Sequence, residues 1–386
     1  MNPLYAALPT TIFEVMSGLA RETGAINLGQ GFPDEPGPES IRRKAAEAVV
    51  DGWNQYPPMR GLPELRRAVS DHYRRHQGLE LDWEHEITVT SGATEALAAA
   101  ILALISPGDE AVMFQPLYDA YAPLIRRAGG TVRLVRLEPP HWRITDAALE
   151  AAFTPSTRVV VFNNPLNPAG VAFPIEDLER LARTCVRHDA VVVADEVWEH
   201  VIFDGRRHTS MMSLPQMRGR TVKIGSAGKM FALTGWKVGF VCAGRDLALP
   251  ISKAHQFLTF TTPPNLQSAV AWGLENSEDW FRSMPQALAR SRDRLAKALA
   301  DAGYCVLHSG GTYFLNIDLA RSGVRIPDHE FCMRAVREFG VAAIPVSSFY
   351  ESDPVTSVVR LCFAKADATL DEAARRLGQA RAALAG

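Results

Sequence analysis

The stretch Ile224-Gly-Ser-Ala-Gly-Lys229-Met-Phe-Ala-Leu-Thr-Gly-Trp-Lys237-Val-Gly239 places one lysine among small residues and a second lysine eight positions further on. An exposed loop lysine needs neither the glycines nor a cationic partner at a fixed spacing. A lysine that forms a Schiff base beside a bound phosphate needs both. Its amine must reach a carbonyl, and a nearby cation lowers the pKa of that amine and binds the phosphate. Lys229 is therefore the first candidate for a catalytic group.

Two apolar, β-branched runs ahead of this stretch have the pattern of buried parallel strands. Ala190–Ala194 leads into Asp195, and Val159–Phe162 leads into a loop rich in Asn and Pro that contains Asn167. Asp195 then stands where ligands bind in open α/β sheets, and its carboxylate could keep a pyridine nitrogen protonated. The Asn amides could donate to a ring hydroxyl. Taken singly, the Asp is more often a helix cap and the loop an ordinary turn signal.

A third segment, Glu86-Ile-Thr-Val-Thr90-Ser91-Gly92-Ala93-Thr94-Glu95, predicts a strand, a glycine turn and the start of a long apolar helix. The free amides at the start of a helix lie at the positive end of its dipole, which makes an anion site. Each of these segments is ordinary by itself; their combination is specific.

In this order and spacing the motifs resemble those of pyridoxal-phosphate enzymes of fold type I, the class I and II aminotransferases. The resemblance runs from Gly29–Asp34 to Val359–Phe363. Ser226–Lys229 followed by Thr234–Gly239 is similar to the kynurenine and glutamine aminotransferases, which include cysteine-S-conjugate β-lyases, and to bacterial methionine aminotransferases. Most relatives carry Arg where Lys237 stands, so this lysine marks the subgroup.

The resemblance implies that pyridoxal 5′-phosphate is the cofactor and that Lys229 holds it through a Schiff base and carries the substrate α-proton. Asp195 would pair with the pyridinium nitrogen and Asn167 with the ring hydroxyl, while Tyr118 would stack on the ring. The groups expected around the phosphate are the turn at Gly92, the amides of Ala93 and Thr94, the hydroxyl of Ser226 and the charge of Lys237.

The same resemblance assigns the substrate contacts. Arg360 would clamp the α-carboxylate with a bidentate fork, a task that lysine performs poorly. Gly31 would add a backbone contact, with Asn167 nearby, and Phe13 would lie near the substrate side chain.

Two further aromatic residues match positions that relatives contribute across a homodimer interface. Tyr56 would reach the phosphate in the partner subunit, and Phe260 would line the substrate pocket of the partner. Ordinary packing is the alternative for both aromatic residues.

Trp198 departs from the family pattern, because relatives carry a tyrosine three residues after the ring-pairing Asp. An indole can donate one hydrogen bond but cannot accept one or exchange a phenolic proton. Trp198 is still counted among the cofactor-binding residues, with two alternatives open. Either it contacts the ring oxygen and shifts the electronics of the cofactor, or it points elsewhere.

Composition limits the remaining possibilities. A chain of 386 residues that is 47% hydrophobic and 22% charged is typical of a soluble globular protein with a large core. A net charge of −2 argues against nucleic-acid binding through a broad basic field. Five scattered cysteines favour reduced thiols in a cytoplasm over a disulfide framework. The longest apolar run, Ala96–Ile105, is ten residues, too short for a membrane span, and no basic residue precedes Arg21, which argues against a secretory signal.

Two histidine-containing patterns are expected to have no binding or catalytic role. The basic run Leu65–His76 predicts a solvated helix face. No metal site is expected, because five other histidines lack metal-ligand spacing: His141, His188, His200, His208 and His255.

Helical patterns alternate with apolar strands up to about residue 270, which predicts βαβ units and a mainly parallel sheet. A helical stretch from Leu266 to Ala302 is expected to break near Pro285, and strand patterns at Thr312–Ile317 and Val358–Phe363 follow it. The expected fold is α/β, the fold type I of pyridoxal-phosphate transferases, with a seven-stranded sheet between helices and a smaller α+β domain. The expected parts are an N-terminal arm over residues 1–38, a large cofactor-binding domain over 39–272 and a small domain over 273–386. The family resemblance adds that the arm joins the small domain.

The functional hypothesis is an aminotransferase that moves the amino group of a neutral, sulfur-containing or aromatic L-amino acid to a 2-oxo acid by a ping-pong mechanism. Methionine, glutamine and kynurenine represent the expected donors, and the lack of a second dedicated arginine disfavours an acidic one. The first alternative is a cysteine-S-conjugate β-lyase, which begins with the same proton abstraction. The second is a non-catalytic ligand-sensing module, which the presence of Lys229, Asp195 and Arg360 disfavours.

Overall fold

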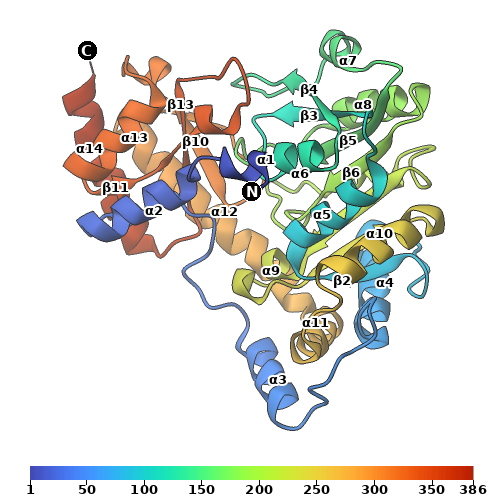
Figure 1. Ribbon diagram of the computed structural model, residues 1–386. Coiled ribbons are helices and arrows are strands. Elements are labelled where there is room, and N and C mark those ends of the chain that lie inside the picture. Colours follow the sequence, from blue (N-terminus) through green and yellow to red (C-terminus); the bar gives the residue numbers. More distant parts are fainter. Residues whose placement is uncertain (386) are drawn as a thin grey trace.

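The computed structural model describes residues 1–385 and is built around a seven-stranded sheet (Figure 1). Its strands are β2 (Ile87–Thr90), β3 (Glu110–Gln115), β4 (Thr131–Arg136), β5 (Thr157–Asn163), β6 (Val191–Asp195), β7 (Thr221–Ser226) and β8 (Gly239–Ala243). They lie in the order β2-β8-β7-β6-β5-β3-β4. β8 is antiparallel to both of its neighbours, and all other pairs are parallel. The mainly parallel sheet predicted from the sequence is confirmed.

Helices cover both faces of this sheet. Successive strand residues point to opposite faces, so Met113 and Val161 pack in one core cluster while Val112 and Val160 pack in another. The first cluster lies under α5 (Gly92–Leu104), α6 (Tyr121–Arg127) and α10 (Arg245–Leu258), and the second under α7 (Asp146–Ala152) and α8 (Ile175–Arg187). Beside β2 lies α4 (Pro63–Gln77), and α11 (Pro264–Asn276) packs on both α4 and α3 (Glu39–Val50).

A second, smaller set of strands belongs to the other part of the chain (Figure 1). An antiparallel sheet has the order β12 (Ile344–Pro345), β13 (Val358–Cys362), β10 (Phe314–Asp318) and β9 (Cys305–Leu307). From the N-terminal arm, β1 (Ile26–Asn27) pairs in parallel with β11 (Val341–Ala342). The accompanying helices are α1 (Pro3–Ala6), α2 (Ile12–Thr23), α12 (Glu278–Asp301), α13 (Asp328–Glu338) and α14 (Asp367–Leu384). Short helical turns are α9 (Ala227–Met230), η1 (Met211–Ser213), η2 (Thr234–Trp236), η3 (Ala320–Ser322) and η4 (Val346–Phe349).

The predicted helix break near Pro285 is wrong. The chain breaks at Ser277, between α11 and α12, and Pro285 lies inside α12. Proline lacks the N–H that would bond the carbonyl four residues earlier, which weakens a helix but does not end one that tertiary packing holds. The buried side chains of Phe281, Met284 and Leu295 hold α12 on both sides of the proline.

The expectation of a solvated face for Leu65–His76 is also wrong in part. His72 and Tyr73 on α4 are 1% and 0% exposed. The Nε2 atoms of His72 and His200 lie 2.8 Å apart, and the rings of His76 and Phe281 pack beside them. The apolar partner Phe281 comes from α12, far away in the sequence, so local charge patterning could not reveal this burial.

Glu196, Glu199 and His208 bring potential metal-binding atoms within 4.8 Å of one another. Lys223 lies between the two carboxylates, with its ammonium at hydrogen-bond distance from each. These charges raise the pKa of the buried Lys223 to about 12, against the effect of its burial. The ammonium therefore supplies the cation that the two carboxylates require.

Two further expectations concern cysteines and membranes. All five cysteines are free, as the sequence predicts. Among residues 1–385, none of the helices combines the length and the apolar character that crossing a membrane requires.

The histidine pair predicts that stability decreases in acid. Burial, and the neighbouring cations, hold the pKa values of His72 and His200 well below 6.5 in the folded state. Their contribution is thus fully present above the unfolded pKa near 6.5 and is lost as the pH falls below it, by at most about 1.4 kcal/mol per histidine and pH unit. The melting temperature should fall between pH 7.5 and pH 5.5, and it should fall less in His200→Gln.

His308→Gln is the matched control, because the His308 side chain is 73% exposed. An equal acid-induced fall in both variants and in the unmodified protein would contradict the assignment to the buried pair.

Candidate active site

A cavity of about 450 Å³ opens at the carboxyl ends of β5, β6 and β7, with β10 and β13 supplying its other wall. It brings together most of the residues singled out from the sequence. Those lining it are Phe13, Gly31, Gly92, Ala93, Thr94, Tyr118, Asn167, Asp195, Trp198, Ser226, Lys229, Lys237 and Arg360. The cavity gathers them from segments that are far apart along the chain.

Lys229 lies on the short helix α9, directly after β7. Its Nζ donates a hydrogen bond to the carbonyl of Gly31 (3.1 Å) and lies 4.4 Å from the ring centre of Trp198. Burial lowers the pKa of Lys229 to about 8, and the charges of Arg360 and Lys237 act in the same direction while Asp195 opposes them. The neutral fraction of this amine near physiological pH is thus much larger than that of an ordinary lysine, and the neutral form is the one that acts as a nucleophile or general base.

Asp195 ends β6 and is 5% exposed. The hydroxyl of Tyr121 donates a hydrogen bond to its Oδ2, while Asn163 Nδ2 donates to its backbone carbonyl (2.8 Å). Burial raises the pKa of Asp195 to about 6, and the Tyr121 hydrogen bond opposes the rise. Asn163 also accepts the backbone N–H of Asn167 (2.8 Å), so one side chain fixes both strand-end segments.

The start of α5 forms a cationic cup with Lys237. Gly92 has φ +77°, and a Cβ built there would lie 3.3 Å from Lys237 Nζ and 3.1 Å from its Cε. Glycine therefore lets the lysine lie close to the first turn of α5, whose backbone N–H groups have no partner within the helix. A Cβ on Gly239 would lie 2.8 Å from the amide nitrogen of Ala93, so β8 also approaches this turn closely.

Arg360 on β13 is 1% exposed. Its guanidinium donates to Asn167 Oδ1 (2.8 Å) and to the Gly29 carbonyl (2.6 Å) and lies 3.8 Å from the ring centre of Phe314. Its Nε is buried without a hydrogen-bond partner. Burial lowers the pKa of Arg360 to about 9, so the group remains charged at neutral pH. Within residues 1–385, no carboxylate forms an ion pair with this buried cation, although the negative charge of Asp119 opposes the lowering of its pKa.

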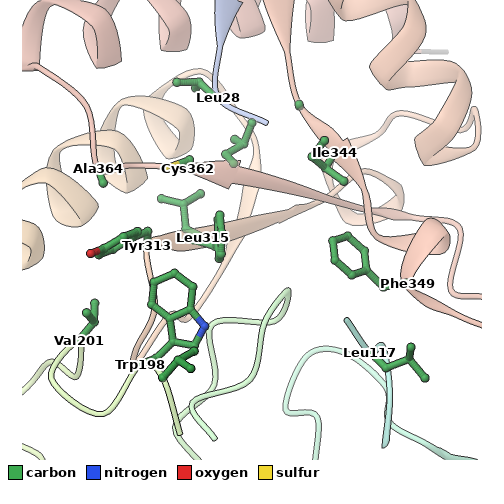
Figure 2. Packing of buried hydrophobic residues seen from close by; sticks show 14 of the residues in the cluster. Leu28, Leu117, Trp198, Val201, Tyr313, Leu315, Ile344, Phe349, Cys362 and Ala364 are labelled. Carbon is green, nitrogen blue, oxygen red and sulfur yellow. The ribbon is translucent and has the colours of Figure 1, made fainter. Parts of the chain in front are cut away.

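Trp198 packs its ring edgewise on Tyr313, with ring centres 4.7 Å apart (Figure 2). Figure 2 shows both aromatic rings beside Leu315, within the core cluster that reaches Cys362. The hydroxyl of Tyr313 donates to the backbone carbonyl of Lys229 (3.1 Å). The indole thus lies beside the lysine, and its contact with a cofactor ring stays a prediction.

Tyr56 and Phe260 do not line the cavity. They are 81% and 40% exposed and pack edge to face on each other, with ring centres 5.5 Å apart. Their assignment to the site of a partner subunit stays a prediction.

The family model described as aminotransferase class I and II matches residues 23–377. The chain belongs to the class I and II aminotransferases. Methionine aminotransferase of Escherichia coli is 41% identical over 372 residues, with 96% of each chain covered. N-succinyldiaminopimelate aminotransferase of Mycobacterium tuberculosis is 42% identical over 379 residues, with 95% of each covered, and kynurenine–oxoglutarate transaminase 1 of Homo sapiens is 35% identical, with 91% of each covered.

Solved structures agree with the family assignment. The E. coli protein identified as a methionine aminotransferase superposes with a TM-score of 0.94, covering 97% of this chain and 98% of that one. The M. tuberculosis N-succinyldiaminopimelate aminotransferase superposes with a TM-score of 0.95, covering 98% and 99%. This aminotransferase therefore has the fold type I architecture predicted from its sequence.

Pyridoxal phosphate is the cofactor of this family, and the cavity residues of this aminotransferase fit it. The cup of α5 and Lys237 suits a phosphate dianion, the buried carboxylate of Asp195 suits a protonated ring nitrogen, and the partly neutral amine of Lys229 suits a carbonyl carbon. All three groups line the same cavity.

Sequence reasoning gave no site role to several residues that line the cavity or contact Arg360, among them Tyr121, Asn163, Phe314 and Phe349. Phe314 was predicted only as part of the strand Thr312–Ile317. Tyr121 is the first residue of α6, three positions after Tyr118, which lies in the loop before that helix, so no helical periodicity links the two tyrosines. Asn163 ends β5, directly before the loop rich in Asn and Pro, and the sequence pattern assigned it no role. The ring centre of Phe349 lies 5.1 Å from Arg360 Cζ, and the ring packs edgewise on Phe13. Phe349 comes from η4, where no local sequence pattern marks it.

The lowered pKa of Lys229 predicts its reactivity in the cofactor-free protein. Labelling with acetic anhydride, a small amine reagent, should rise with a midpoint near pH 8 and reach a plateau by about pH 9.5, measured on the peptide by mass spectrometry. Lys297, whose side chain is 76% exposed, provides the reference for reagent reactivity at each pH. Labelling of Lys229 that still increases steeply above pH 10 would contradict the burial argument.

Proposed function

We propose that this aminotransferase takes the amino group from a neutral, sulfur-containing or aromatic L-amino acid and transfers it to a 2-oxo acid by a ping-pong mechanism. The observation that carries the proposal is the buried, unpaired Arg360 under the aromatic rings of Phe13, Phe314 and Phe349. Lys229, Lys237 and Arg360 are the cations lining the cavity within residues 1–385. With Lys229 and Lys237 assigned to the cofactor, one cation is left for one carboxylate.

Substrate binding follows from the charge at Arg360. The guanidinium fork would exchange its contact with a neutral carbonyl for a bidentate pair with the α-carboxylate. Asn167 is the neighbouring orienting group, because its Oδ1 accepts from Arg360 and its Nδ2 is left to donate toward the ring hydroxyl. Gly31 brings its backbone beside the same carboxylate, since a Cβ there would collide with Phe314.

Lys229 would perform the proton transfer. Its neutral amine would accept the α-proton of the bound amino acid and would return that proton later in the same half-reaction. Asp195 keeps a proton at the ring nitrogen, while Tyr118 covers the ring face and Ser226, Lys237 and the α5 amides hold the phosphate. Pyridoxal phosphate, when bound, supplies the electron sink for the pair left at the α-carbon.

The proposed functional unit is a homodimer in which Tyr56 and Phe260 serve the site of the partner subunit. Their exposure and mutual contact support a role outside their own cavity. The division into residues 1–38, 39–272 and 273–386 is part of the same proposal, supported by the separate seven-stranded and four-stranded sheets.

A second candidate donor comes from the M. tuberculosis relative, whose name specifies N-succinyldiaminopimelate. Such a donor carries further carboxylates, which need further cations.

One experiment separates these possibilities. The cofactor-loaded protein is mixed separately with methionine, kynurenine, N-succinyldiaminopimelate and a cysteine conjugate, while cofactor absorbance, 2-oxo acid and ammonia are followed. Conversion to the pyridoxamine form without ammonia, faster with methionine or kynurenine, is the expected outcome. Preference for N-succinyldiaminopimelate would overturn the proposed side-chain class. Ammonia with an unchanged cofactor spectrum would indicate a β-lyase.

Arg360→Lys keeps a positive charge but loses the bidentate fork. The KM for the amino acid donor should rise about ten-fold or more with a smaller change in kcat, because the contact is made with the bound substrate as well as in the transition state. Arg294→Gln is the control, since Arg294 pairs with Asp371 on the surface. An unchanged KM in Arg360→Lys would remove Arg360 from the substrate site.

A further inference from the structure

We propose that Tyr121 is a positioning residue for Asp195: its hydroxyl holds Oδ2 of the carboxylate and thereby leaves Oδ1, in its ionised form, to accept the ring N–H of the cofactor. The proposal rests on the proposed role of Asp195 and goes beyond it. It concerns which residue makes a buried carboxylate a suitable partner for a protonated ring.

The two oxygens of Asp195 are held differently. Oδ2 accepts the hydrogen bond of the Tyr121 phenol, while Oδ1 receives only a long contact of 3.4 Å from the backbone amide of Val197. Oδ1 therefore keeps acceptor capacity, and Asp195 lines the cavity. The backbone carbonyl of Asp195 is fixed separately by Asn163 and Asn164. The phenol is thus the side-chain contact that sets the rotation of the carboxylate.

Tyr121 is itself held firmly. It is 2% exposed at the first turn of α6, with Ala122 and Ile125 of the same helix buried beside it. Its ring packs edgewise on Tyr118, with centres 5.7 Å apart, so the ring proposed to cover the cofactor supports the phenol. Helix α6 in turn packs on α5, whose first turn forms the cationic cup with Lys237 (Figure 1).

The hydrogen bond also selects a protonation state. Burial, and then the nearby Asp195, hold the pKa of Tyr121 well above its usual range, so the phenol keeps its proton and acts as a donor. A donor stabilises an ionised carboxylate, whereas burial favours the protonated carboxyl. Without the phenol, burial is less opposed and the pKa of Asp195 rises above about 6.

Other charged groups face this pair. Lys229 stabilises the ionised Asp195 and Glu196 destabilises it, while Tyr118 and Asp119 act on Tyr121. These groups remain in a Tyr121→Phe variant. A comparison of variant with unmodified protein at each pH therefore isolates the phenol.

The test measures binding of pyridoxamine 5′-phosphate to the cofactor-free protein, through the fluorescence of the tryptophans that include Trp198 in the cavity wall. This probe carries an amine, so it forms no Schiff base with Lys229. Tyr121→Phe should weaken binding roughly five- to ten-fold at pH 6.5 and clearly less at pH 8.5, where the carboxylate is ionised in both proteins. A ratio of dissociation constants that does not change with pH would overturn the proposal.

Two controls separate positioning from loss of packing. Tyr304→Phe removes another buried phenol, whose hydroxyl bonds the Leu377 carbonyl (2.7 Å) far from the cavity, and should leave the ratio unchanged. In an Asp195→Asn background, Tyr121→Phe should add no pH-dependent effect, because the titrating carboxyl is gone. A pH-dependent effect that persists in that background would overturn the proposal.

The outcomes also distinguish this proposal from the proposed pairing of Asp195 with the ring nitrogen, on which it rests. If Asp195→Asn binds the probe as tightly as unmodified protein, the assignment of Asp195 to the ring fails. If Asp195→Asn weakens binding and Tyr121→Phe does not, only the role of Tyr121 fails. Should Tyr121→Phe not fold, 3-fluorotyrosine at position 121 provides a stronger donor and should shift the ratio in the opposite direction; no shift would count against the proposal.

Discussion

Among residues 1–385, the buried guanidinium of Arg360 has no carboxylate as an ion-pair partner, and the arrangement of this site depends on that constraint. Removing a cation from water costs several kcal/mol unless polar partners replace the water. Arg360 finds them in Gly29 of the N-terminal arm and Asn167 of the loop after β5, with the ring face of Phe314 beneath. The contacts tie three distant segments together and neutralise none of the charge. Arg360 therefore keeps its positive charge inside the cavity, where it can bind a carboxylate.

Neighbouring charges also give opposite pKa shifts to two buried lysines near the end of β7. Lys223, within β7, donates to Glu196 and Glu199, and these carboxylates raise its pKa to about 12. Lys229, six residues later, lies near Arg360 and Lys237, and burial together with these cations lowers its pKa to about 8 against the opposing effects of Cys362 and Asp195. Burial is common to both, so the neighbouring charges decide. One lysine is a fixed structural cation, and the other can exchange its proton at neutral pH.

The sequence predicted those features that strand ends determine. Asp195 and Asn167 follow parallel strands, and Lys229 follows the next strand of the sheet, so the topology alone brings them to one edge. Prediction from the sequence failed for residues whose packing partners come from distant parts of the chain. The burial of His72 depends on His200 and Phe281, and Pro285 stays helical because α12 is packed on both sides of it. Phe349 approaches Arg360 from a short turn with no pattern of its own.

Trp198 shows how the departure from the family pattern changes the surroundings of the lysine. A phenol at this position would offer a hydroxyl, whereas the indole offers its π face to Lys229 Nζ at 4.4 Å. A ring face stabilises the charged ammonium, against the desolvation that favours the neutral amine. The phenol that lies close to the lysine segment is Tyr313, and its proton is committed to the Lys229 backbone carbonyl. Burial and the charges of Arg360 and Lys237 therefore lower the proton affinity of the amine, the aromatic face opposes them, and the phenol of Tyr313 donates no hydrogen bond to its nitrogen.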